Sequence, residues 1–129
     1  MNKKSDAVDL LKTSLEALRQ QVLPALSGNT RTVGLMVANA MGIAIRVLQQ
    51  GDAQEAEEMR GLQALVRGEL DDPSSLRREL IQQIRTGAFD AETHPEGASR
   101  LKSFLSQSVV AQCSIDQPKA LAALEEAQP

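Results

Sequence analysis

The chain has 129 residues, with 14 Lys and Arg against 17 Asp and Glu, so its formal net charge at pH 7 is −3. This balance argues against a dedicated nucleic-acid binder, which needs clustered basic charge. Only two residues are aromatic, so the core must be built from Leu, Ile, Val, Met and Ala. That composition favours helices packed on helices over a sheet. The single cysteine, Cys113, excludes an intramolecular disulfide and a multi-cysteine zinc site.

The first residues, MNKKSDAVDLL, contain two lysines but no apolar run of secretory length, because Asp6 and Asp9 interrupt it. We therefore expect a cytoplasmic protein. Its length suits one helical domain spanning residues 1–129, with residues 1–5 and 122–129 frayed.

The first predicted helix runs from Asp6 to about Leu26, with Ser5 as its cap. Pro24 lacks an amide donor, so it should kink this helix or begin its last turn. Apolar residues recur at helical spacing along one stripe: Val8, Leu11, Leu15, Leu18, Val22 and Leu26.

The second predicted helix, residues 31–50, is apolar on almost every face, so it must be wrapped by other helices or span a membrane. Its longest uncharged run, residues 33–45, covers only about 20 Å, against roughly 30 Å of bilayer hydrocarbon. We therefore predict the central helix of a soluble protein, with no membrane partner. Thr30 is the expected cap, after a turn at residues 27–29, and Gly51 is the expected end.

Three or four further helices follow. A third is expected over residues 53–67, with Asp52 as its cap and its early glutamates near the positive end of the helix dipole. Asp72 and Pro73 open a fourth that ends at Gly87. A fifth spans residues 98–114, and a short helix, KALAALEEA, follows Pro118. The core positions predicted on these helices are Met59, Leu62, Leu65, Val66, Leu76, Leu80, Ile84, Leu101, Phe104, Leu105, Val109 and Ile115. The prediction is an all-α, single-domain bundle of five to six helices around a central apolar helix.

Catalytic signals are scarce. The single histidine, His94, lies before a proline in an expected loop, and an exposed loop histidine is the favoured interpretation. No phosphate-binding GxxxxGK or GxGxxG motif occurs, and the carboxylate runs lack the Glu-x-x-His partners of a di-iron bundle. Cys113 is expected to be a small, partly buried residue. We assign no catalytic residue, metal ligand or cofactor.

One polar stripe interrupts the central helix. Arg31, Asn39 and Arg46 lie within about 80° of one another on a helical wheel, separated by Ala38 and Gly42. In one interpretation Asn39 bonds to a facing helix and the arginines reach solvent or carboxylates. In the other, the stripe receives an anionic group or a partner subunit. The small-residue ridge of Gly34, Ala38 and Gly42 permits a close helix crossing in either case.

Four short motifs occur in a distinctive order: VLPAL at 22–26, VANAMGIAIRVL at 37–48, IRTGAFD at 84–90 and IDQPKAL at 115–121. Together they resemble a family of small bacterial helical proteins of unknown function, over residues 7–119. Such proteins are typically encoded beside an aminoglycoside-phosphotransferase-like kinase and an acyl-CoA dehydrogenase-like protein. The resemblance implies an accessory subunit of a kinase that phosphorylates 4-hydroxyacyl-CoA.

The family pattern extends to particular residues. Asn39 and Arg46 match its central helix, and Asp116 and Pro118 match its terminal motif, which with Lys119 forms a second possible partner contact. The resemblance also implies a lysine at the position of Gln112 and an asparagine at that of Gln117, so this chain departs from the family pattern at both positions.

Two functions therefore remain open from the sequence. The first is a non-catalytic accessory subunit of a phosphotransferase-type kinase that acts on hydroxyacyl-CoA substrates. The second is a self-contained homodimeric interaction module that buries part of the central helix against its own copy.

Overall fold

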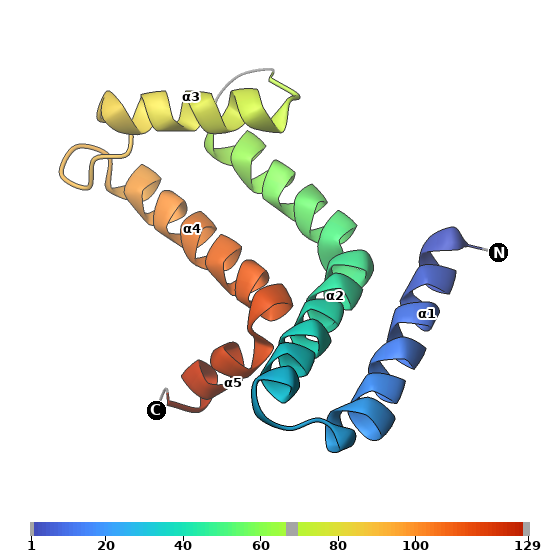
Figure 1. Ribbon diagram of the computed structural model, residues 1–129. Coiled ribbons are helices and arrows are strands. Elements are labelled where there is room, and N and C mark those ends of the chain that lie inside the picture. Colours follow the sequence, from blue (N-terminus) through green and yellow to red (C-terminus); the bar gives the residue numbers. More distant parts are fainter. Residues whose placement is uncertain (1, 67–69, 128–129) are drawn as a thin grey trace. The chain divides into compact units, whose positions relative to one another are not determined.

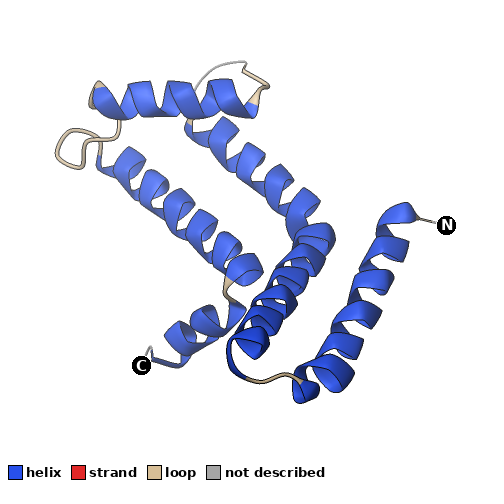
Figure 2. Cartoon of the chain, viewed as in Figure 1, coloured by secondary structure: helices blue, strands red, loops and turns tan. Residues whose placement is uncertain are grey.

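The computed structural model describes residues 2–66 and 70–127. These residues form five α-helices and no strand (Figures 1 and 2), which confirms the predicted all-α fold with a long apolar helix. The helices are α1 (Lys3–Ala17), α2 (Gly28–Leu65), α3 (Pro73–Arg85), α4 (Pro95–Asp116) and α5 (Pro118–Ala127).

Helix α1 begins earlier than expected and ends in an irregular turn. Its cap is Asn2, whose side chain accepts a hydrogen bond from the Lys4 amide at 3.0 Å, so Ser5 is not the cap. After Ala17 the chain forms a π-helical turn, Leu18–Val22, and then a 3₁₀ turn, Leu23–Ala25. The wider π turn lies just before Pro24, whose ring would clash with the preceding turn of a regular α-helix.

The π turn changes which side chain faces the core. The stripe predicted Val22 as a buried position, but Val22 is 44% exposed and Leu23 is 6% exposed. Because a π turn holds more residues than an α turn, it advances the buried position by one residue.

Helix α2 joins the second and third predicted helices into one helix of 38 residues. The predicted end at Gly51 and cap at Asp52 are wrong, because Gly51 keeps a helical backbone and Asp52 lies inside the helix. An interior glycine costs only about 1 kcal/mol, and strong helix formers on both sides can offset it. The Asp52 carboxylate also accepts a hydrogen bond from Lys4 Nζ at 2.6 Å. The predicted end at Arg67 lies outside the described residues.

Contacts divide the chain into two compact units, which meet along the sequence between Asp52 and Ala53. In the N-terminal unit α1 lies beside the first half of α2 (Figure 1). The predicted ridge of small residues, Gly34, Ala38 and Gly42, is buried: Ala38 belongs to one core cluster with Val8 and Leu15 of α1, and a Cβ at position 34 would lie 2.7 Å from Leu23 Cδ2 in the 3₁₀ turn. The buried core of this unit comprises Val8, Leu15, Leu23, Ala38 and Ile45.

The expectation that helices wrap the apolar segment of α2 on all sides is not met. Val33, Met36, Val37 and Val47 are between 47% and 67% exposed. Length and composition alone would let α2 cross a membrane, and 17% of its most apolar 18-residue window is buried. The core helix of a soluble protein and a signal sequence can have the same length and composition, so these two properties do not assign α2 to a membrane. The cytoplasmic location stays a prediction.

The C-terminal unit has its own core, formed by Leu62, Leu65, Val66, Leu76 and Leu80. All five were predicted, and Met59, Phe89, Leu101 and Phe104 pack against them. Ile115 is also buried, as predicted. Three other predictions are wrong, because Ile84, Leu105 and Val109 are 44% to 62% exposed.

The ends of the later helices follow local chemistry. Asp72 caps α3 as predicted, and Gly87 follows this helix with a φ of +86° that suits glycine. Helix α4 begins at Pro95 rather than Ala98, because proline is well accommodated at the first helical position. Residues 3–5 belong to α1 and residues 122–127 to α5, whereas residues 1, 128 and 129 lie outside the described part.

Candidate functional site

The three residues of the predicted polar stripe have different surroundings. Arg31 lies in the first turn of α2, and its Nη1 donates a hydrogen bond of 2.7 Å to the backbone oxygen of Leu23. This carbonyl belongs to the 3₁₀ turn that precedes α2. Arg31 therefore ties the start of α2 to the end of the preceding helical segment, which is a structural contact.

Asn39 and Arg46 lie further along the same helix. Asn39 is exposed, and its side chain has no hydrogen bond within the described residues. Arg46 is half-buried and folds back along α2, so that a Cβ at position 42 would lie 3.2 Å from its Nη1. The absence of a side chain at Gly42 therefore leaves room for the guanidinium. These two side chains present hydrogen-bonding groups on one side of the helix.

An exposed apolar surface borders these two residues. We call it the outer face of α2: Val33, Met36, Val37, Ala40 and Val47. On a helical wheel it lies nearly opposite the buried ridge of small residues. The outer face was not predicted from the sequence, because an apolar helix was expected to be wrapped on all sides. A signal was present, since apolar residues recur at heptad a and d spacing at 33, 36, 40, 43 and 47.

The second predicted contact lies where α4 meets α5, in the C-terminal unit. Asp116 is the last residue of α4, and its carboxylate accepts a hydrogen bond of 2.8 Å from Gln112 Nε2. Pro118 is the first residue of α5, and both Pro118 and Lys119 are exposed.

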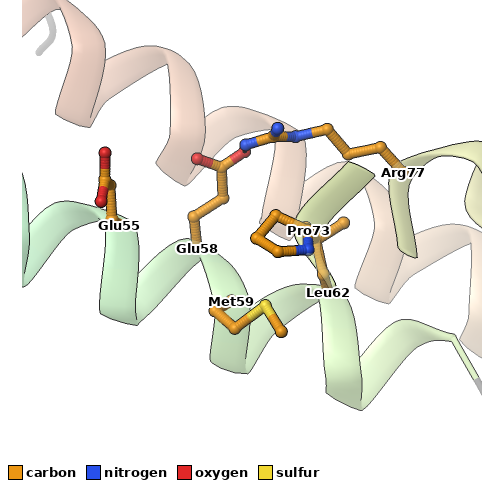
Figure 3. A pocket seen from close by; sticks show the side chains of 6 residues that line it. All are labelled: Glu55, Glu58, Met59, Leu62, Pro73 and Arg77. Atoms are coloured by element: carbon orange, nitrogen blue, oxygen red, sulfur yellow. The ribbon is translucent and has the colours of Figure 1, made fainter. Parts of the chain in front are cut away.

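A small hollow of about 230 Å³ lies between the second half of α2 and the start of α3 (Figure 3). Its polar wall is an ion pair in which Arg77 Nη2 lies 3.0 Å from Glu58 Oε1. Met59, Leu62 and Pro73 form its apolar wall (Figure 3). The hollow is smaller than typical ligand pockets of about 300–1,000 Å³. Glu58 neutralises Arg77, and because both side chains are partly exposed the ion pair contributes little to stability.

The carboxylates predicted at a helix start lie elsewhere. Glu55, Glu57 and Glu58 are inside α2, so they do not complement a helix N-terminus. Within residues 2–66 and 70–127, no group of three or more His, Cys, Asp or Glu could hold a metal ion. Cys113 is half-buried, as predicted. His94 is exposed and directly precedes α4, with its Nδ1 2.9 Å from Thr93 Oγ1.

Among the residues that the structure describes, one carboxyl group has a clearly shifted pKa. The Asp72 side chain accepts hydrogen bonds of 3.0 Å from the amide and the hydroxyl of Ser75. These bonds favour the charged form and lower the pKa of Asp72 below its usual value of 3.8. This shift belongs to the cap of α3 and is a feature of folding rather than of catalysis.

Comparison with known families assigns the chain to one of them. Residues 24–120 match the family described as a domain of unknown function, DUF6285. The match covers more than half of the chain, so the protein belongs to this family. The resemblance to a family of unknown function is thereby confirmed. No curated protein and no solved structure matches the chain.

Proposed function

We propose that the protein is a non-catalytic accessory subunit of a phosphotransferase-type kinase that acts on hydroxyacyl-CoA substrates. The observation that carries this proposal is the outer face of α2, an apolar surface bordered by Asn39 and Arg46. Contiguous apolar patches on soluble proteins often mark interaction sites, and arginine is enriched at such interfaces. The aminoglycoside-phosphotransferase-like kinase implied by the family resemblance is the proposed partner.

In this proposal the kinase and this chain contribute different groups to the reaction. A phosphoryl transfer needs a nucleotide site and a group that orients the attacking hydroxyl. In the proposal the kinase brings both, while this chain supplies a surface that stabilises the kinase or its acyl-CoA complex. The isolated chain should then neither bind nor hydrolyse ATP. Calorimetry that detected micromolar ATP binding to the purified chain would contradict this assignment.

The alternative is a homodimeric interaction module. It is favoured by one observation, the heptad spacing of apolar residues along the outer face, because this pattern suits a paired helix of the same sequence. The two functions predict different partners for one surface. Light scattering on the isolated chain separates them, since a homodimer forms without the kinase and an accessory subunit stays monomeric until the kinase is added.

The test is co-purification with the proposed aminoglycoside-phosphotransferase-like kinase, followed by an assay of ATP-dependent acyl-CoA phosphorylation. Met36→Glu should abolish co-purification, because it places a charge on the outer face at a side chain that is 67% exposed. Arg46→Ala should weaken assembly at least roughly tenfold, a loss of about 1.4 kcal/mol. Lys119→Glu reverses a charge at the second predicted contact, and it should weaken co-purification if that contact binds the kinase.

Leu10→Glu is the matched control, because Leu10 is 70% exposed on α1 and lies outside the outer face. This variant should bind the kinase like the natural chain. Circular dichroism must show that all variants keep their helices. If folded Met36→Glu binds the kinase with unchanged affinity, the outer face is not the docking surface. If the natural chain neither binds the kinase nor changes its activity, the accessory-subunit assignment is wrong.

A further inference from the structure

A second, larger hollow lies in the C-terminal unit, at the start of α4, and neither the accessory-subunit role nor the homodimer uses it. Its volume is about 550 Å³, which is within the usual range for small-molecule sites. Leu65, Phe89 and Gly97 provide apolar lining, whereas Gln83, His94, Glu96 and Arg100 bring polar groups to the same space. The hollow therefore combines an apolar wall with groups that can orient a polar ligand.

The two charged residues of this hollow are not paired with each other. Glu96 and Arg100 are four residues apart on α4, a spacing at which opposite charges commonly form an ion pair. The structure shows no ion pair or hydrogen bond from either side chain within the described residues. Both residues are exposed and line the hollow, so the hollow offers one carboxylate and one guanidinium.

Other polar groups extend this arrangement. His94 uses Nδ1 toward Thr93 Oγ1, which leaves Nε2 without a partner in the described part of the chain. The Gln83 amide nitrogen donates to Glu79 Oε1 at 3.3 Å, so the Gln83 side-chain oxygen remains able to accept a hydrogen bond. A ligand in this hollow would therefore meet hydrogen-bond acceptors at Gln83 and Glu96 and a cationic donor at Arg100.

We propose that this hollow binds a small zwitterion: an amino acid whose carboxylate and ammonium are separated by a short apolar chain. The carboxylate would bind Arg100, which can hold it through two parallel hydrogen bonds. The ammonium would bind Glu96 and the Gln83 oxygen, and the intervening carbons would lie on Phe89 and Leu65. A simple anion would match Arg100 but would be repelled by Glu96, and a simple amine would have the opposite mismatch.

The experiment is calorimetric or NMR titration of the full chain with 5-aminopentanoate, pentanoate and pentylamine. We expect 5-aminopentanoate to bind at least tenfold more tightly than the other two probes. Arg100→Gln and Glu96→Gln should each remove most of that advantage. The matched control is Lys102→Gln, which removes an exposed charge from α4 outside the hollow and should leave binding unchanged.

A variant without a charge change tests the hollow independently, in case Arg100→Gln or Glu96→Gln perturbs folding. Phe89→Leu retains an apolar side chain but shortens the wall, and it should weaken binding of all three probes alike. The proposal is overturned if 5-aminopentanoate fails to bind, if pentanoate binds as tightly, or if folded Arg100→Gln binds like the natural chain. It is independent of the kinase assignment, because the probes are tested without any partner protein.

Discussion

The ring of Phe104 on α4 lies directly against the backbone of Gly61 on α2. A Cβ built at position 61 would be 2.7 Å from Phe104 Cδ2 and 2.8 Å from Cε2, well inside van der Waals contact. Gly61 is thus required by packing, although it costs helix propensity. This contact allows α2 and α4 to approach closely in the core of the C-terminal unit.

Gly61→Ala should destabilise the protein. Alanine improves helix propensity by about 1 kcal/mol, but overpacking typically costs about 1–3 kcal/mol, so we expect a net loss of about 1 kcal/mol. Urea unfolding measures the change. Gly51→Ala is the matched control on the same helix, because a Cβ there would meet only Val47 Cγ1, at an ordinary 3.7 Å. This control should stabilise the chain, and a stabilising Gly61→Ala would show that the ring moves aside freely.

Two aliphatic positions on α3 test the core assignment. Leu76→Ala should cost about 2–5 kcal/mol, because Leu76 is fully buried and the deletion leaves a cavity. Ile84→Ala should cost less than about 1 kcal/mol, because 44% of Ile84 is exposed. Chemical denaturation of both variants provides the comparison. Equal losses of unfolding free energy in the two variants would mean that Ile84 is buried in solution.

The sequence predicted these helices well where the signal is local. Asp72 followed by Pro73, and Gly87 at the far end, defined α3 because capping depends on neighbouring residues. Gly51 was misleading for the same reason: a glycine ends some helices and lies inside others, and only tertiary context decides. The π turn before Pro24 shifted a buried position by one residue, which a regular helical wheel cannot represent.

The candidate site was less accessible to sequence reasoning. The spacing grouped Arg31 with Asn39 and Arg46, but only the structure reveals that Arg31 bonds to the Leu23 carbonyl. Hydropathy identified an apolar helix without telling which side would remain exposed, because burial depends on the neighbouring helix. The outer face remains exposed because α1 and the 3₁₀ turn pack on the other side of α2, against Ala38 and Gly34.

The cap of α3 gives a pH-dependent prediction. Because the folded-state pKa of Asp72 lies below 3.8, its cap stabilises the protein fully above that value, and the contribution is lost as the pH falls through the folded-state pKa. Asp72→Ala should therefore lower the melting temperature at pH 7. The difference in melting temperature between the natural chain and this variant, the gap, should narrow in more acidic solution. Thermal melts from pH 7 to pH 3 measure it. The control is Asp71→Ala, since Asp71 lies outside the cap, and a gap independent of pH would contradict the assignment.

The contact between Arg31 and Leu23 predicts that one residue of the polar stripe acts in folding. Arg31→Met keeps most of the apolar stem but removes one of two donors to the Leu23 carbonyl, which still accepts a hydrogen bond of 3.1 Å from the Leu26 amide. We expect a loss of about 1 kcal/mol, the net contribution of a typical hydrogen bond, measured by urea unfolding. Arg19→Met removes an exposed arginine from the π turn and should have little effect. If Arg31→Met unfolds like the natural chain but loses kinase binding, Arg31 belongs to the docking surface with Asn39 and Arg46. If it is destabilised yet still binds, the docking surface begins beyond the first turn of α2.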